Sequence, residues 1–289
     1  MDQHCAVAVP TELMSIKQLP PLSPTASRLL RVVGDPDVEV DEIASIIEQD
    51  PGLTARILGL ANSAYFGQAR PIHRVQEAII RVLGLNLVKS LSMGIAMAGS
   101  FDTQACLRLD MGEYWYQSLG SAVLGRLIAQ RIQSGGILDS DAVYLCGLLH
   151  QIGLLLLAHA FPAALSDALE AREQEPDKDL VQLEQQFLDT DHILSGEWLA
   201  RRWHLPEVVG DTIAFQRRDD YQGAHATELC IVQGVDRWLQ ENSPDQAAHL
   251  ADVVCLKRLP GLDEQSLADI EKQYSKQAEE LRTLSRTLL

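Results

Sequence analysis

The sequence predicts an all-α protein, and two observations support this prediction. Apolar residues recur at intervals of three, four and seven residues in almost every segment, which is the pattern of a helix with one buried face. No segment alternates apolar and polar residues for long enough to require a β-sheet. At 289 residues with a hydrophobic content of 46%, the chain can also bury a large core.

Local signals mark where the first helices begin. Ser23-Pro24 combines a capping serine with a proline at the first helical position. Asp50-Pro51 likewise combines a capping aspartate with a proline at that position. The isoleucines between Ile43 and Ile47 indicate another helix between these two. We expect the remaining helices at 75–84, 86–100, 112–133, 140–159, 162–173, 177–188, 192–204, 206–217, 225–241, 244–259 and 263–288.

Composition and charge exclude several classes of protein. The formal net charge is −16, and residues 1–100 carry 8 basic against 10 acidic side chains, so residues 101–289 hold −14 of it. Such acidity opposes direct DNA binding and contact with anionic membranes. The five scattered cysteines suit a reducing compartment rather than a disulfide framework. The most apolar stretch, 145–158, is too short to span a bilayer, and no signal peptide is visible, so we expect a cytoplasmic location.

Two groups of motifs resemble the HDOD domain, the HD-related output domain of bacterial signalling proteins. The first group runs from Leu19-Pro20-Pro21-Leu22 through Asp50-Pro51-Gly52-Leu53 to Asn62-Ser63 and Leu83-Gly84; the second contains Trp115, Gly147 to Gly153, His192 and Trp203-His204-Leu205-Pro206. The resemblance implies an HDOD domain over 17–217, in which an N-terminal helical lobe (17–100) packs on an HD-like lobe (108–217). A C-terminal helical extension would follow at 218–289.

The resemblance also implies where a metal centre would lie, and the residues found there are mostly neutral. HD hydrolases hold metals with a histidine-acid pair and further histidines, but here His150 is followed by Gln151 instead of an acid. Gln117 and Gln216 stand where other histidines are expected, and only His192 matches a later one. Loss of the carboxylate removes a large part of the attraction for a divalent ion. We therefore expect no metal, no cofactor and no catalytic residue.

His159 does not restore such a site. On a continuous helix it would lie nine residues after His150 and therefore on the opposite side.

Three interpretations of His150-Gln151 stay open: a hydrogen-bonded polar pair in the core, a ligand pocket, or a metal site. In the pocket interpretation, Gln117, His150, Gln151, His192 and Gln216 would form a degenerate HD pocket for a ligand. A basic segment containing Arg70, His73 and Arg74, with Arg81 and Lys89 nearby, is either a solvated face or a contact for an anion or an acidic partner.

We expect a non-catalytic regulatory protein that acts on signalling proteins in trans. It would bind a partner protein or a small ligand through its HDOD domain. The alternatives are a sensor that binds a nucleotide or cyclic dinucleotide in the degenerate HD cavity and a divergent metal-dependent phosphohydrolase. Homodimer formation is also left open.

Overall fold

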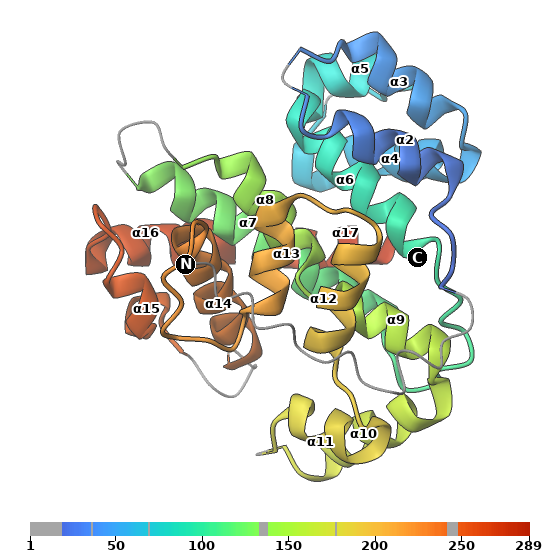
Figure 1. The fold of residues 1–289 in the computed structure, drawn as a ribbon. Helices are drawn as coiled ribbons and strands as arrows, with labels where there is room; N and C mark the ends of the chain where they lie inside the picture. The colour runs from blue at the N-terminus through green and yellow to red at the C-terminus, as the bar shows by residue number, and fades with distance from the viewer. Residues whose placement is uncertain (1–18, 36, 69, 133–137, 177, 242–247) are drawn as a thin grey trace.

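The computed structural model describes residues 19–35, 37–68, 70–132, 138–176, 178–241 and 248–289. In these residues the secondary structure consists of α-helices with short 3-10 and π segments, and it contains no strand. The predicted all-α class is confirmed. Figure 1 shows the helices of residues 24–98 gathered at one end of the molecule and the other helices beside and below them, with two of these projecting away from the rest.

Among the described residues, the N-terminal lobe is formed by five α-helices and two short segments. Its caps agree with the sequence: the Ser23 side chain accepts a hydrogen bond from the Ala26 nitrogen, and Asp50 accepts one from the Leu53 nitrogen, both at 3.0 Å. The elements are α2 (Pro24–Val32), α3 (Val40–Glu48), α4 (Pro51–Ala61), η1 (Ala64–Phe66), α5 (Val75–Ala78), the π-helical η2 (Ile79–Leu83) and α6 (Leu85–Ala98).

The HD-like lobe is built around α7, which packs against α8, while α8 also contacts α6 of the N-terminal lobe. Two helices, α10 and α11, project from this lobe (Figure 1), and they share a smaller apolar core with one face of α9. The helices are α7 (Met111–Arg131), α8 (Ser140–Leu149), α9 (Ile152–Ala160), α10 (Pro162–Gln174), α11 (Leu180–Leu188), α12 (His192–Arg202) and α13 (Glu207–Ala214).

The C-terminal helices pack on the same central helix as the HD-like lobe. Three of them, α14, α16 and α17, contact α7, and α17 also contacts η1 of the N-terminal lobe. One continuous apolar core joins all three parts of the chain. The elements are α14 (Ala226–Glu241), η3 (Leu250–Asp252), α15 (Val254–Lys257), α16 (Glu264–Ser275) and α17 (Ala278–Arg286).

Two predicted C-terminal helices are wrong in extent. The single helix expected at 263–288 is divided into α16 and α17, and the Gln277 nitrogen bonds to the Tyr274 carbonyl where the two meet. Of the helix expected at 244–259, residues 244–247 lie outside the described residues, and the rest contains only the short η3 and α15.

The continuous helix predicted at 140–159 is also wrong, because it breaks at His150. In an α-helix the Gly147 carbonyl would accept from the nitrogen of Gln151, but here it bonds to the His150 ring at 2.7 Å. The stretch Ser140–Ala160 has the length and composition of a membrane span, yet 83% of its most apolar window is buried inside the molecule.

Because the helix breaks at His150, helical spacing no longer excludes His159 from a metal site beside His150. The contacts of His159 still do so. The Nδ1 atom of His159 accepts a hydrogen bond from the Asp102 nitrogen at 3.1 Å, and its ring lies beside Phe101.

Candidate functional site

Two glycines hold the break between α8 and α9 against neighbouring helices. A Cβ atom on Gly147 would lie 2.7 Å from the backbone nitrogen of Ala122 in α7, and one on Gly153 would lie 1.9 Å from the carbonyl oxygen of His192 in α12. A side chain fits at neither distance, so both backbones approach as closely as glycine alone permits. His150, midway between the glycines, is therefore fixed between α7 and α12.

Both ring nitrogens of His150 are engaged by acceptors from the protein itself. Nδ1 lies 2.7 Å from the Gly147 carbonyl oxygen, and Nε2 lies 3.1 Å from Oδ1 of Asp236. A carbonyl oxygen can only accept, so Nδ1 donates to Gly147, and Nε2 faces the Asp236 carboxylate. The His150 side chain is 1% exposed, which makes this a buried histidine–carboxylate contact.

Asp236 comes from α14 and also contacts the residue that replaces the HD acid. Its Oδ1 accepts from the Gln151 amide at 3.3 Å, and its Oδ2 accepts from the Gln240 amide at 2.8 Å. Burial alone would raise the pKa of Asp236, but the hydrogen bond and charge of His150 hold this pKa below its usual range. The Asp236 side chain is 21% exposed, so the pair reaches solvent at one edge.

A second buried acid-histidine pair joins α11 to α12. Oε2 of Glu184 accepts from the His192 ring at 2.6 Å and from the His192 backbone nitrogen at 2.9 Å. Burial would lower the pKa of His192, but the Glu184 carboxylate raises it above its usual value. The charges of His192 and Asp236 also shift each other's pKa, so the two pairs interact electrostatically.

Of the three glutamines predicted in the degenerate HD pocket, Gln151 contacts Asp236, and the other two lie in different surroundings. The Gln216 amide donates to the Ile213 carbonyl at 3.2 Å and to the His150 carbonyl at 3.5 Å, so it belongs to the His150 site. The Gln117 amide donates to Glu113 one turn earlier on α7, at 2.8 Å. The Oε1 atom of Gln117 is buried and has no hydrogen-bond partner in the described part of the chain.

The side chains around His150 do not fit a catalytic metal. Across the described ranges, no group of three or more histidine, cysteine or acidic residues is arranged to hold one. At this position His150 and Asp236 are two ligand-type side chains, and Gln151 supplies no charge. The arrangement consists of two buried acid–histidine contacts between helices.

Sequence reasoning missed both acids of these pairs. Glu184 had a usable signal, because the spacing Leu180, Glu184, Leu188 places it on an apolar helix face, where a charge requires a partner. Asp236 lies 86 residues after His150, in the segment assigned to the extension, and no local pattern connects the two.

The basic segment of the N-terminal lobe is exposed where it leads into α5. Arg70, His73 and Arg74 are all exposed, and Ile80, a few residues further, is 71% exposed. Asn62 at the end of α4 fixes the loop, because its side chain donates to the Ile72 carbonyl at 2.8 Å and accepts from the Ile72 nitrogen at 2.7 Å. The two arginines and His73 are thus presented on a segment that Asn62 anchors.

Lys89 and Arg81, which the sequence places near this segment, do not add exposed, unpaired positive charge to it. Lys89 is 6% exposed, and its ammonium donates to the Asp35 carbonyl at 2.9 Å, so its inclusion in an exposed basic face is wrong. Arg81 forms an ion pair with Glu77 on the same helical segment.

The motifs before α7 and around His150 occur together in a known family. The HDOD domain family model matches residues 19–218. The chain belongs to the HDOD family. An uncharacterized protein of Treponema pallidum (strain Nichols) is 30% identical over 203 residues, which are 69% of this chain but 38% of that protein. The HDOD chain thus spans well under half the length of this relative.

Solved structures extend the likeness beyond residue 218. An HDOD domain protein with unknown function from Geobacter sulfurreducens has a TM-score of 0.76 and 26% identity, covering 100% of this chain and 99% of its own. A candidate signal transduction protein from Marinobacter aquaeolei VT8 has a TM-score of 0.80 and 25% identity, covering 93% of this chain and 60% of its own. The helix that carries Asp236 is therefore part of the fold shared with the Geobacter protein.

Proposed function

We propose that this HDOD protein is a non-catalytic regulatory protein that acts in signal transduction by binding a partner protein. The observation that carries the proposal is the state of His150, whose two ring nitrogens both bond to the protein's own acceptors, Gly147 and Asp236. A hydrolase of this fold would need that ring as a metal ligand. The family membership and the Marinobacter signalling protein support the regulatory role.

The buried pairs give such a protein a way to connect its parts. His150 sits at the junction of α8 and α9, and Asp236 sits on α14, so their bond ties the HD-like lobe to the C-terminal helices. A partner that favours one packing of α14 would shift the population toward that packing by its difference in affinity for the two states. The site would therefore act as a structural link.

The exposed basic segment is the surface that we assign to the partner. Arg70, His73 and Arg74 lie exposed on one segment, close in sequence to the exposed Ile80. The chain as a whole carries a net charge of −16, so this basic segment differs from the rest of the protein. Cations beside an exposed aliphatic side chain suit an acidic protein surface with an apolar centre. We propose an acidic signalling protein as the partner.

One experiment tests the absence of catalysis. The full chain is purified without chelator, its Mn, Fe and Zn contents are measured, and it is incubated with nucleotides and cyclic dinucleotides. We expect no stoichiometric metal and no hydrolysis. Turnover that disappears in His150→Ala and Asp236→Ala would establish the phosphohydrolase instead. Thermal stabilisation by a cyclic dinucleotide, lost in His150→Ala, would favour the nucleotide sensor.

A second experiment tests the partner surface. The wild-type chain and Arg70→Glu/Arg74→Glu are used as bait in extracts of the native cell, and captured proteins are identified by mass spectrometry. Lys272→Glu/Arg286→Glu is the matched control, because it makes the same charge change at exposed positions in the C-terminal helices. We expect an acidic protein that is lost only with the first variant. Equal capture by both variants would contradict this assignment.

A further inference from the structure

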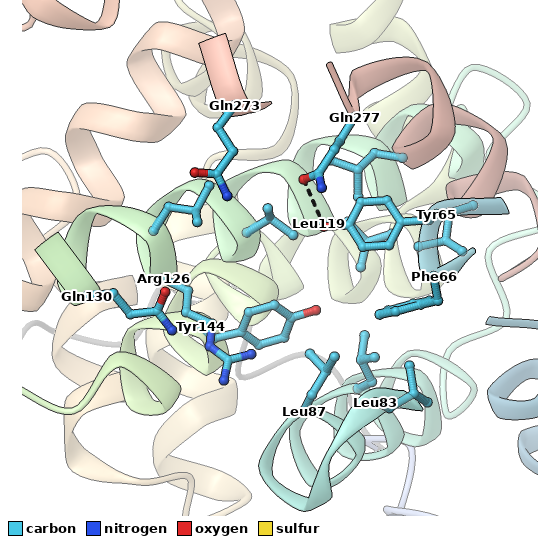
Figure 2. A pocket seen from close by; sticks show the side chains of 15 residues that line it. Tyr65, Phe66, Leu83, Leu87, Leu119, Arg126, Gln130, Tyr144, Gln273 and Gln277 are labelled. Carbon is cyan, nitrogen blue, oxygen red and sulfur yellow. Dashed lines mark hydrogen bonds between the residues drawn. The ribbon is translucent and has the colours of Figure 1, made fainter. Parts of the chain in front are cut away.

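A pocket of about 290 Å³ lies where the three parts of the chain meet, away from His150. Figure 2 shows side chains that converge on it from η1 and α6 of the N-terminal lobe, from α7 and α8, and from the C-terminal helices. This volume is at the lower end of the range for small-molecule sites. No residue of the degenerate HD pocket or of the basic segment lines it.

The walls of the pocket are mostly apolar, and its polar groups are few. Eight leucine and valine side chains and the rings of Tyr65, Phe66 and Tyr144 form most of the lining. The rings of Tyr65 and Phe66 stand edge to face, with centroids 4.8 Å apart. Aliphatic walls with aromatic rings and a few directed polar groups are typical of sites that bind an apolar organic molecule.

Arg126 is the one charged side chain among the described residues that line the pocket, and none of them is acidic. Its Nη2 bonds to Asp141 at 2.9 Å, whereas its buried Nε has no hydrogen-bond partner in the described part of the chain. Asp141 is held in turn by the Asn86 amide at 2.6 Å, which fixes the position of the guanidinium. An arginine on the wall of an otherwise uncharged, mostly apolar pocket suits a carboxylate.

A second donor faces the same space. In Figure 2 the Tyr144 hydroxyl points into the pocket between Leu87 and the rings of Tyr65 and Phe66. Burial raises the pKa of Tyr144, so this hydroxyl keeps its proton and can donate a hydrogen bond. On the opposite wall the Tyr65 hydroxyl donates to Oε1 of Gln277 at 3.3 Å, which joins η1 to the C-terminal helices.

We propose that this pocket binds a small organic acid with an apolar body, with the carboxylate on Arg126 and Tyr144, and that the bound acid holds the N-terminal lobe against α17. One guanidinium in a pocket of this size suits a single carboxylate rather than the several phosphate oxygens of a nucleotide. Because its lining comes from three parts of the chain, occupancy strengthens contacts among all of them. The inference does not depend on the partner surface or on the state of His150.

Calorimetry on the full chain tests the site with two acids, 4-phenylbutyrate and octanoate, and with the matching alcohols. We expect at least one acid to bind with one molecule per chain, and its alcohol to bind at least about tenfold more weakly, as loss of a charge-assisted hydrogen bond requires. Failure of both acids to bind at millimolar concentration would overturn the proposal, as would equal affinity for acid and alcohol.

Variants locate the binding. Arg126→Gln should weaken it about tenfold or more, because the charge is lost. Arg108→Gln is the matched control, since Arg108 also pairs with acids, Glu170 and Glu173, but lies outside the pocket, and it should bind like wild type. Val123→Phe fills the pocket and should abolish binding while the helical circular dichroism is retained. Unchanged affinity in Arg126→Gln would place the acid elsewhere and refute the site.

Hydrogen exchange gives a readout that does not depend on any variant. The bound acid should slow amide exchange in both η1 and α17, which are far apart in sequence but share the pocket. Protection confined to other helices would contradict the proposed location. Loss of partner capture in Arg70→Glu/Arg74→Glu leaves these results unaffected, so the two proposals can fail separately.

Discussion

The Asp236 carboxylate lies 3.1 Å from Nε2 of His150, and it reaches that position from a helix that begins 76 residues after the α8–α9 break. It places a negative charge beside the amide of Gln151, at 3.3 Å. Gln151 lacks the negative charge of the acid in an HD pair, and Asp236, which is distant in sequence, supplies a carboxylate beside it. Because it is directed at the histidine ring, the Asp236 carboxylate occupies Nε2 of His150.

Replacement of Asp236 should destabilise the protein. Asp236→Asn removes the charge that pairs with the buried His150 ring, and it should lower the free energy of unfolding by about 2 kcal/mol, the usual size for a hydrogen bond to a charged group. Asp219→Asn is the matched control, because Asp219 forms an exposed ion pair with Arg237 at 3.5 Å, and it should change stability by less than about 0.5 kcal/mol. Urea denaturation measures both. Equal losses in the two variants would show that the buried pair is energetically unimportant.

Stability should decline at both ends of the pH range for different reasons. The pKa of Asp236 is lower in the folded chain than its usual 3.8, so its contribution is complete above that pH and is lost as the pH falls through the folded value. The pKa of His192 is raised above 6.5, so its contribution is complete below pH 6.5 and is lost as the pH rises through the folded value.

Urea denaturation across this range measures the two limbs. His192→Gln should flatten mainly the decline above pH 6.5, whereas Asp236→Asn should flatten mainly the decline on the acid side. A decline above pH 6.5 that persists unchanged in His192→Gln would assign it to another group.

The close approach of α9 to α12 predicts opposite effects for two glycine substitutions. Gly153→Ala would place a methyl group 1.9 Å from the His192 carbonyl oxygen, and the shift this forces should cost about 3 kcal/mol or more. Gly59 lies exposed in α4, and a Cβ atom added there would meet no other atom within 4 Å, so Gly59→Ala should stabilise the protein by about 0.5 to 1 kcal/mol. Thermal unfolding compares them. Similar melting temperatures for both variants would mean that the two helices separate easily.

Two cysteines should differ in reactivity. The hydrogen bond with Cys230 lowers the pKa of Cys255 below its usual value, whereas burial raises the pKa of Cys146 to about 12. Alkylation by iodoacetamide, followed by mass spectrometry, should label Cys255 at a lower pH than an ordinary thiol and leave Cys146 unlabelled in the folded chain. Cys230→Ala should move the Cys255 midpoint to higher pH, and an unchanged midpoint would assign the shift to another cause.

Features that depend on neighbouring residues could be predicted from the sequence, and features that depend on distant ones could not. Ser23 and Asp50 cap helices as expected, because a cap involves only the next three residues. The break at His150 was missed because the ring takes a carbonyl that the helix would otherwise use. The partner of His150 could not be found, because hydrophobic periodicity places Asp236 on a helix without indicating what that helix contacts.

The hydrogen bond between His150 at the α8–α9 break and Asp236 on α14 also affects when the chain can finish folding during synthesis on the ribosome. His150 emerges well before Asp236, and until residues near Gln240 have left the exit tunnel its Nε2 atom has no carboxylate to meet. The nascent HD-like lobe therefore lacks this buried contact and the packing of α14, and partly folded chains of this kind are prone to aggregation. Translation that stops ahead of α14 would leave a product unable to finish folding, even though it contains most of the motifs by which the family is known.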